Sequence, residues 1–371
     1  MKPSVLVHLV AAARPNFMKV APLYHALSLE PWCNPFLIHT GQHYDTNMSE
    51  DFLMDLGLPG PHRHLGVGSG TNAEQTAGVM VAYERVCLEQ QPDWVIVVGD
   101  VNSTMACALT AKKLCLRVAH LEAGLRSRDW TMPEEINRLV TDAISDLLWT
   151  PSEDADENLL REGIPESKIV RVGNIMMDSY EMLRDKIDAE QTTAQLELTP
   201  QTYGVVTVHR PTNVDHQEPL SRLTSLILNL SAQLPLVFPV HPRTRKRLEA
   251  FGLLGQLQRS PDLHLTEPMG YIRFMSLIKE AKMVITDSGG IQEETTYLNI
   301  PCLTLRENTE RPITLTRGTN RLVRLDNLGE NMNQVMRGEW RQGVRPELWD
   351  GHTSERVVKS IKKACGIENG P

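Results

Sequence analysis

Short apolar runs alternate with longer amphipathic segments along most of this chain, and that alternation restricts the fold more than any other feature of the sequence. Strand–helix alternation is typical of a parallel sheet with crossover helices, and strands that are apolar throughout are typical of a sheet covered on both faces. In the first half, the predicted strands are Val5–Val10, Phe36–His39, Trp94–Val98, Arg117–Leu121, Leu147–Thr150 and Lys168–Val172. The predicted helices between them are Asn16–Leu29, Asn72–Glu89, Ser103–Leu114, Pro133–Ser145 and Glu153–Glu162.

The alternation pauses over residues 181–202, which are polar and contain no apolar strand, so we expect a linker and an exposed helix there. The sequence therefore predicts an α/β fold with two Rossmann-like doubly wound domains, residues 1–175 and 176–353. Residues 354–371 contain a basic helix with apolar residues on one side, which we expect to pack back across the domains. The strands predicted in the second half are Tyr203–Val208, Leu236–Val240, Leu263–Leu265, Met283–Thr286, Pro301–Leu305 and Arg321–Arg324.

The overall charge and the cysteine pattern exclude several classes of protein. The 371 residues carry a net charge of −8, whereas a protein that binds nucleic acid by general electrostatics needs a basic surface. The six cysteines form no CxxC pair or Cys/His cluster, so we expect reduced thiols and no structural metal site. The first apolar run is interpreted as a strand and not as a signal peptide, and no apolar stretch approaches the roughly 20 residues that span a bilayer. We therefore expect a cytoplasmic protein with no nucleic-acid or membrane partner.

Polar residues follow the carboxyl ends of six predicted strands, drawn from both halves of the chain. In an open parallel sheet, ligands bind beyond these ends. Because so many strand ends carry such groups, we expect them to converge on one site. The residues are Arg14, Lys19, Asp100, Glu122, His209, Arg210, His241 and the segment Asp287–Gly290.

The segment Asp287–Gly290 lies at a predicted strand-to-helix turn. Asp and Ser are favoured helix caps, so the segment could simply cap that helix. Glycines at such a turn also expose backbone N–H groups and the helix dipole to a phosphate. We favour phosphate binding, with Arg14, Lys19 and Arg311 as counter-charges.

Several carboxylates and histidines are candidates for proton transfer. Asp100 follows an apolar strand and a glycine, which exposes its carboxylate only to the crevice beyond the sheet. His209 lies at a strand end, which favours a functional histidine over one that is simply part of the core. For His43, the sequence favours neither interpretation. Glu134 and Arg138 are four residues apart and share a helix face. In isolation, that spacing favours a surface ion pair.

The glycine-rich segment Gly66–Gly70 does not match a nucleotide-binding loop. It lacks the Gly-Lys-Ser/Thr of a Walker A loop and is not GxGxxG. We interpret it as a flexible loop that could serve as a lid. Since no GxGxxG follows the first strand either, we expect no bound nicotinamide cofactor.

These motifs, in this order, resemble the non-hydrolysing UDP-N-acetylglucosamine 2-epimerases over nearly the whole chain. The resemblance implies a glycosyltransferase-B-like pair of Rossmann-type domains with an interdomain cleft, a homodimer, a UDP-sugar substrate and no cofactor. The segments that carry it are Ala13–Lys19, Thr40–Asp45, Gly99–Asp100, His120–Arg126, Pro133–Arg138, Val172–Asn174, His209–Arg210, His241–Pro242, Asp287–Glu294 and Glu310–Pro312.

The resemblance also implies a mechanism. The C2 proton of the sugar is removed, UDP is eliminated to give 2-acetamidoglucal, and UDP adds back after C2 is protonated on the other face. Such a reaction needs at least two titratable groups and a stabilised leaving group. Clustered carboxylates can supply an acid and a base near neutral pH, because each raises the pKa of its neighbours.

The family's site residues carry over onto matching positions of this chain. The catalytic set is Asp100, Glu122, Glu134 and His209, of which His209 is expected to act chiefly on the diphosphate. Glu294 matches a position that binds the UDP ribose, and Phe274 and Arg311 match positions near the nucleotide. The substrate-binding set is Arg14, Lys19, Arg138, Arg210, His241, Phe274, Ser288, Gly289, Gly290, Glu294 and Arg311.

The chain departs from bacterial members that have a second, activating UDP-sugar site. Four positions of that site match, at Gln42, Glu134, Arg210 and His241, but Asp45 replaces a glutamine and the loop at 66–72 offers no arginine. This form of activation is therefore in doubt. Three other readings stay open: a hydrolysing relative that releases N-acetylmannosamine and UDP, an epimerase of a 3-acetamido or uronic-acid sugar, and a non-catalytic sugar-nucleotide binder.

Overall fold

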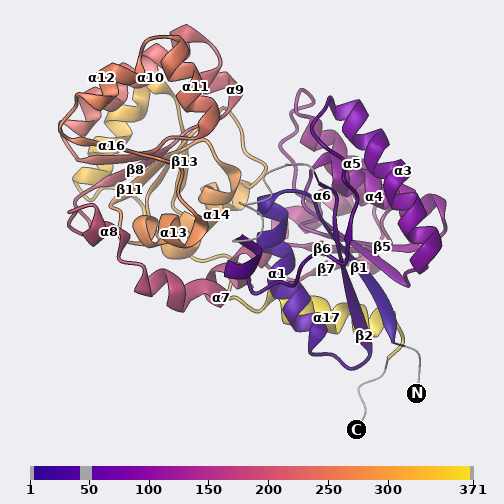
Figure 1. Ribbon diagram of the computed structural model, residues 1–371. Coiled ribbons are helices and arrows are strands. Elements are labelled where there is room, and N and C mark those ends of the chain that lie inside the picture. Colours follow the sequence, from indigo (N-terminus) through magenta and orange to yellow (C-terminus); the bar gives the residue numbers. More distant parts are fainter. Residues whose placement is uncertain (1–3, 42–51, 368–371) are drawn as a thin grey trace. The chain divides into compact units, whose positions relative to one another are not determined.

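The computed structural model describes residues 4–41 and 52–367, so Gln42, His43 and Asp45 lie outside the described residues. The chain divides into two compact units (Figure 1). The N-terminal unit comprises Met1–Met182 together with Glu347–Pro371, and the C-terminal unit comprises Leu183–Pro346.

The N-terminal unit is built on a seven-stranded parallel sheet in the order β3-β2-β1-β4-β5-β6-β7. The order reverses between β1 and β4, and such a switch point is where ligands bind in open α/β sheets. The sequence did not predict β3, because its two residues are exposed and form no apolar run. The strands are β1 (Val5–Ala11), β2 (Cys33–His39), β3 (Arg63–His64), β4 (Trp94–Val98), β5 (Arg117–Leu121), β6 (Leu147–Thr150) and β7 (Ile169–Arg171).

Helices cover both faces of this sheet (Figure 1). For the five helices predicted between the first and last strands of this sheet, the boundaries lie within two residues of those expected, because each begins or ends at a strand-to-helix turn that the sequence marks with polar residues. The helices of this unit are α1 (Arg14–Ser28), α3 (Asn72–Gln90), α4 (Asn102–Lys113), α5 (Pro133–Ile144), α6 (Glu153–Arg161), α7 (Ile175–Ala189) and α17 (Thr353–Ala364).

The C-terminal helix α17 belongs to the N-terminal unit. It packs against α1, with Val357, Val358 and Ile361 buried as their spacing indicates. The carboxylate of Asp178 accepts hydrogen bonds from the backbone N–H groups of Thr353 (3.0 Å) and Ser354 (2.7 Å) at the start of α17. These bonds satisfy two N–H groups that a helix leaves without an internal partner.

The C-terminal unit repeats the arrangement with a six-stranded parallel sheet in the order β10-β9-β8-β11-β12-β13. Its switch point lies between β8 and β11, and the two doubly wound units confirm the predicted fold class. The strands are β8 (Gly204–Thr207), β9 (Leu236–Pro239), β10 (Leu263–Thr266), β11 (Met283–Thr286), β12 (Cys302–Leu305) and β13 (Asn320–Val323). The helices are α8 (Thr192–Gln195), α9 (Pro211–Val214), α10 (Gln217–Ser231), α11 (Pro242–Ala250), α12 (Leu254–Gln258), α13 (Tyr271–Lys279), α14 (Gly289–Leu298), α15 (Pro312–Thr316) and α16 (Leu328–Met336).

The polar stretch at residues 181–202 is more ordered than a linker. Helix α7 continues to Ala189, and its residues Leu183 and Ile187 are buried although the neighbouring side chains are exposed. The prediction of an exposed helix is therefore wrong for the side of α7 that carries Leu183 and Ile187. Two apolar residues four positions apart form one buried helix face, and the polar composition of the segment does not reveal it. Across residues 4–41 and 52–367, no helix is long and apolar enough to cross a membrane.

Candidate active site

The carboxyl ends of β1, β4 and β5 meet around Gly99 in the N-terminal unit. A Cβ atom added to Gly99 would lie 3.4 Å from Glu122 Oε2, 3.4 Å from Lys19 Nζ and 3.6 Å from Asn16 Nδ2. Gly99 also has a φ of +71°, which L-residues with a side chain rarely adopt. The backbone here therefore brings polar side chains from two elements to one point beside Gly99: Asn16 and Lys19 of α1, and Glu122 after β5.

Lys19 and Glu122 form a buried ion pair at this point. Lys19 is 9% exposed and Glu122 is 4% exposed. Glu122 Oε2 contacts Lys19 Nζ, whereas Oε1 is buried and has no hydrogen-bond partner within the part of the chain that the structure describes. Lys19 was predicted to lie at a phosphate, whereas in the structure it lies against a carboxylate.

Asp100 is paired with Arg138 of α5. Arg138 Nη1 lies 2.5 Å from Asp100 Oδ2, and Arg138 Nη2 lies 2.5 Å from Glu135 Oε2. Arg138 is 1% exposed, so the interpretation of Glu134 and Arg138 as a surface ion pair is wrong. The side chain of Arg138 points into the protein, where one terminal nitrogen binds Glu135 on the same helix. The fold brings Asp100 to the other terminal nitrogen of the guanidinium.

Glu135 is a residue that the sequence analysis missed. It is 2% exposed, and it also accepts hydrogen bonds from the backbone N–H groups of Ser127 (2.9 Å) and Arg128 (2.8 Å). Burial alone would raise the pKa of Glu135, but the hydrogen bonds from Arg138 and these N–H groups hold it below its usual range. Its anchoring explains why Arg138 can sit buried beside Asp100.

Two further predicted residues of this unit lie near its polar edge. Glu134 is half-buried in the first turn of α5, one residue before the anchored Glu135. Arg14 is exposed at the start of α1, and its guanidinium carbon lies 4.7 Å from the centre of the Phe52 ring. A cation held over an aromatic ring keeps its charge available to an anion.

In the C-terminal unit, Asp287 organises the residues that follow β8. Its carboxylate accepts hydrogen bonds from the backbone N–H groups of His209 (3.0 Å) and Arg210 (2.9 Å), and from Asn213 Nδ2 (2.9 Å). Asp287 is fully buried. Burial alone would raise its pKa, but hydrogen bonds from His209 and its other donors hold that pKa below the usual value. The carboxylate therefore anchors a loop, a role that its position before a helix did not reveal.

The same carboxylate orients the imidazole of His209. His209 Nδ1 lies 3.1 Å from Asp287 Oδ1, so Nδ1 donates and Nε2 is left for another partner. The ring of His241 lies 5.2 Å from that of His209, centre to centre. Two predicted histidines from different strand ends are thus brought together.

The start of α14 lies beside a buried cluster of charged side chains. A Cβ atom added to Gly289 would lie 2.6 Å from Arg311 Nη1 and 2.7 Å from Glu310 Oε1, whereas one added to Gly290 would meet open space. Ser288 is the N-cap residue, and its own side chain makes no capping hydrogen bond. The N-terminus of this ten-residue helix therefore has an approachable side at Gly290.

Arg311 is part of the charged cluster and not an open counter-charge. It pairs with Glu310 and with Glu293 (Nε to Oε1, 2.9 Å), and Arg306 also pairs with Glu310 (2.7 Å). Burial alone would raise the pKa of Glu310, but the two arginines hold it well below its usual range. These ion pairs hold the side chains of Arg311 and Glu310 in place beside Gly289.

Glu294 and Phe274 are the remaining predicted residues. Glu294 lies on α14 and is 4% exposed, and burial raises its pKa to about 8. Phe274 lies half-buried on α13. A neutral carboxyl can both donate and accept a hydrogen bond, as a ribose hydroxyl requires.

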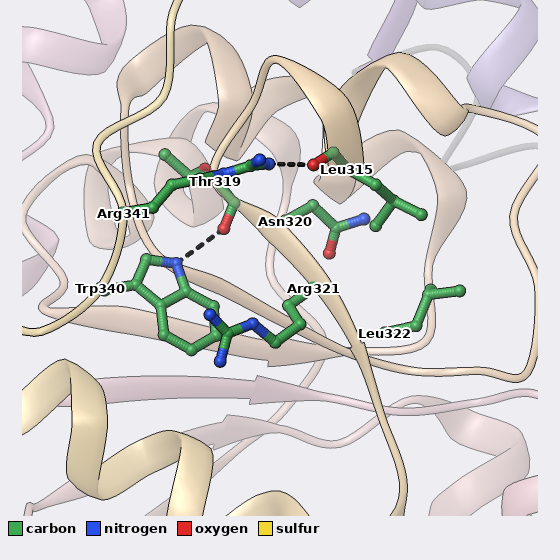
Figure 2. Close-up of a pocket in the computed structure, with 7 residues that line it drawn as sticks. All are labelled: Leu315, Thr319, Asn320, Arg321, Leu322, Trp340 and Arg341. Atoms are coloured by element: carbon green, nitrogen blue, oxygen red, sulfur yellow. Dashed lines mark hydrogen bonds between the residues drawn. The ribbon is translucent and has the colours of Figure 1, made fainter.

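A pocket of about 270 Å³ lies beside β13, and none of the predicted site residues lines it (Figure 2). The guanidinium carbon of Arg321 lies 4.1 Å from the centre of the Trp340 ring, and Trp340 Nε1 donates to Thr319 O (2.8 Å). Arg341 donates to the backbone carbonyl of Leu315 (Figure 2), and also to that of Gly318. These groups brace the end of α15 and the amino end of β13, opposite to the strand ends that carry the candidate site.

Over 4–41 and 52–367, no three His, Cys, Asp or Glu side chains are grouped so that they could hold a metal ion.

Solved structures share this architecture. The structure of Methanocaldococcus jannaschii UDP-GlcNAc 2-epimerase in complex with UDP-GlcNAc and UDP superposes with a TM-score of 0.88 at 40% identity, covering 97% of this chain and all of that one. A lipopolysaccharide outer core galactosyltransferase, 14% identical, superposes with a TM-score of 0.54 over 96% of this chain and 99% of its own. The second likeness shows the fold alone, and it confirms the glycosyltransferase-B-like class.

Sequence comparisons agree. The family model described as UDP-N-acetylglucosamine 2-epimerase matches residues 25–362. The Methanocaldococcus jannaschii UDP-N-acetylglucosamine 2-epimerase is 40% identical over 95% of this chain and 98% of its own. A UDP-2,3-diacetamido-2,3-dideoxy-D-glucuronate 2-epimerase of Pseudomonas aeruginosa is 39% identical over 85% of this chain and 87% of its own. This chain therefore belongs to the UDP-N-acetylglucosamine 2-epimerase family.

Proposed function

We propose that this protein interconverts UDP-N-acetylglucosamine and UDP-N-acetylmannosamine. The observation that carries the proposal is the pair of carboxylates, Asp100 and Glu122, each held against its own cation at the switch point of one sheet. Family membership supplies the substrate class. Two anchored carboxylates at neighbouring strand ends can act as base and acid in reversible proton transfer at a carbon atom.

The reaction balances without an oxidant or a reductant. A base takes the C2 proton, the electron pair of that C–H bond forms the C1–C2 double bond, and the C1–O bond breaks to release UDP. The glycal then takes a proton on the opposite face of C2, and an oxygen of the UDP diphosphate attacks C1. Every group lost in the first half is regained in the second.

Glu122 and Asp100 suit the proton transfers. An ion-paired carboxylate is anionic and can accept a proton, and Glu122 Oε1 has no partner among the described residues. Lys19 and Arg138 offset the repulsion between the two carboxylates. The sequence suggests a cluster of carboxylates without such cations, so the structure differs from that expectation. Glu134, half-buried in the first turn of α5, is proposed as the third group that handles protons.

The C-terminal unit suits the UDP. The N-terminus of α14 at Ser288–Gly290 offers backbone N–H groups and a helix dipole to the diphosphate. His209 Nε2 and the Arg210 side chain would stabilise charge as UDP departs, with His241 as a further donor. Glu294 and Phe274 are proposed to hold the ribose and the base, and Arg311 to keep the wall beside Gly289 in place.

A modified sugar is a second candidate substrate. The Pseudomonas aeruginosa relative named for a 2,3-diacetamido uronate is about as similar to this chain as the relatives named for N-acetylglucosamine. The chemistry at C2 is the same for both sugars, so the residues that contact the substituents at C3 and C6 decide which of the two is the substrate.

Deuterium exchange tests the function directly. The protein is incubated in D₂O with UDP-N-acetylglucosamine, and separately with its 3-acetamido uronate analogue, and products are followed by ¹H NMR. We expect deuterium at C2 and the manno epimer from UDP-N-acetylglucosamine. Exchange confined to the uronate selects the second candidate, free N-acetylmannosamine as main product selects hydrolysis, and no exchange with either sugar contradicts catalysis.

Two finer expectations belong to the same proposal. We propose that the protein acts as a homodimer and in the cytoplasm, where UDP-sugars are made. Light scattering after size-exclusion chromatography would give the mass of a monomer if the first expectation is wrong, and fractionation of the source cells would test the second.

A further inference from the structure

His120 lies on β5, two residues before Glu122, and is fully buried. Its Nε2 lies 2.8 Å from the backbone carbonyl oxygen of Gly99, and its Nδ1 lies 2.6 Å from Asp142 Oδ1. A carbonyl oxygen only accepts hydrogen bonds, so Nε2 must carry a hydrogen.

The partners of Asp142 indicate that the other ring nitrogen carries a hydrogen as well. Asp142 Oδ2 accepts a hydrogen bond from the backbone N–H of Gly124 (3.0 Å) and lies 2.7 Å from Arg126 Nη2. The guanidinium of Arg126, also buried, favours the ionised form of this carboxyl group. An ionised carboxylate only accepts, so His120 Nδ1 donates to it. An imidazole with hydrogen on both nitrogens is a cation.

The hydrogen bond from His120 bears on the backbone that carries Asp100. Gly99, in its left-handed conformation, donates its N–H to Leu121 O (3.0 Å) while its own carbonyl accepts from His120. The carbonyl of Asp100 accepts from Asn137 Nδ2 (2.9 Å). The short segment that carries the Asp100 side chain is thus held at three points.

Asp142 bears on the backbone that carries Glu122. It binds His120 before Glu122 and the N–H of Gly124 after it. Glu122 itself has a φ of +73°, an uncommon conformation for a residue with a side chain, and donates its N–H to Trp149 O (3.1 Å). An uncommon backbone conformation persists where its surroundings hold it from several sides.

We propose that His120 is a positioning residue for the epimerase reaction: a buried imidazolium whose ion pair with Asp142 places both Asp100 and Glu122 for proton transfer. It acts through the Gly99 carbonyl and through the Gly124 turn. The charged groups around it are Asp142 of α5, Arg126 after β5 and, through Arg126, Glu162 at the end of α6. The inference rests on the proposed function, because positioning has meaning only if the two carboxylates move protons.

The charge of the ring can be measured on the wild-type protein without substrate. In ¹⁵N-histidine-labelled protein near neutral pH, we expect both ring nitrogens of His120 to show the chemical shifts of N–H groups, assigned by their loss in His120→Gln. His8 is a matched control, because it is also fully buried in the same unit but, among the described residues, only its Nδ1 has a partner, Tyr83 Oη at 3.1 Å. Burial lowers the pKa of His8 to about 4, so its ring should be neutral in the same spectrum.

Kinetics test what the ion pair does. His120→Gln keeps one donor that can reach the Gly99 carbonyl, and His120→Phe keeps none. We expect kcat for C2 deuterium exchange to fall about 100-fold or more in the first variant and further in the second, since a displacement near 1 Å can cost that much. KM and the affinity for UDP should stay within about threefold in both, because uniform binding is unaffected. His8→Gln should leave kcat unchanged.

The outcomes separate this inference from the proposed function. An active wild-type enzyme whose His120 ring is neutral overturns the inference and leaves the function intact. A folded His120→Gln variant with near-normal kcat overturns it too, as does a loss confined to KM. If both His120 variants fail to fold, the wild-type ring still decides, with the assignment made from His8→Gln and partial labelling. A wild-type protein that exchanges no C2 proton overturns the proposed function and with it the role of His120.

Discussion

Arg138 Nη1 lies 2.5 Å from the carboxylate of Asp100, a residue 38 positions away in the chain. Arg138 reaches that point from the interior, where its other terminal nitrogen binds Glu135. A buried guanidinium with two carboxylate partners is stable only while both remain, because an uncompensated buried charge is costly. Asp100 is therefore coupled to a residue that takes no part in the proposed chemistry.

The adjacent residues Glu134 and Glu135 should separate catalysis from stability. We expect Glu135→Gln to lower the free energy of unfolding by roughly 3–5 kcal/mol, because it removes the buried partner of Arg138. Glu134→Gln should leave stability within about 0.5 kcal/mol, since that side chain is only half-buried, and should lower turnover. Thermal denaturation and the C2 exchange assay on both variants test this. Equal destabilisation by the two changes would contradict the difference in their anchoring.

The two paired carboxylates should be needed for turnover and not for nucleotide binding. We expect Asp100→Asn and Glu122→Gln each to lower kcat by about 10²–10⁴-fold, which is the usual contribution of a positioned acid or base. Calorimetric titration with UDP should give near wild-type affinity, because the nucleotide is proposed to bind the C-terminal unit. Normal turnover in either variant would remove that residue from the mechanism.

Gly289 and Gly290 should respond differently to the same added methyl group. A Cβ atom at Gly289 would come within 2.7 Å of the Arg311 and Glu310 side chains, whereas at Gly290 it would enter open space. We expect Gly289→Ala to lower the melting temperature, and Gly290→Ala to leave it unchanged while weakening UDP binding, because the methyl would occupy the proposed phosphate position. Unchanged UDP affinity in a stable Gly290→Ala variant would show that the phosphate lies elsewhere.

Glu294 should make stability depend on pH. Its pKa is about 8 in the folded chain against an ordinary value of 4.5, so between these values the folded state holds a proton that the unfolded state has released. Stability then falls as pH rises from about 4.5 to about 8, because the unfolded state binds fewer protons over that range. Glu294→Gln, which cannot ionise, should lose this part of the pH dependence.

Denaturation of the wild-type protein and the Glu294→Gln variant at several pH values between 5 and 8.5 would measure the difference. The free energy of unfolding of the wild type, relative to that of the variant, should decrease as pH rises, and the difference should level off above about pH 8. Parallel curves for the two proteins would show that the carboxyl of Glu294 is not held neutral by the fold.

The apolar runs of the sequence determined the strands of both sheets. Trp94–Val98 and Met283–Thr286 have the predicted boundaries because their residues are buried on both faces, so hydrophobicity alone marks them. The short strand β3 escaped prediction for the opposite reason, since Arg63 and His64 are both exposed and pair with β2 only through the backbone. The order of strands along each sheet is likewise a matter of long-range pairing.

The sequence also identified which strand ends carry polar groups, but only the tertiary structure decided their partners. Glu134 and Arg138 share the spacing of an ion pair, yet the fold turns Arg138 toward Asp100 and Glu135. The motif that begins at His120 gives no sign of the partner of that ring, Asp142, which lies 22 positions later. Local spacing determines which residues share a face of a helix or strand. A charged side chain needs a partner distant in sequence only when it is buried, and burial arises only when the elements pack together.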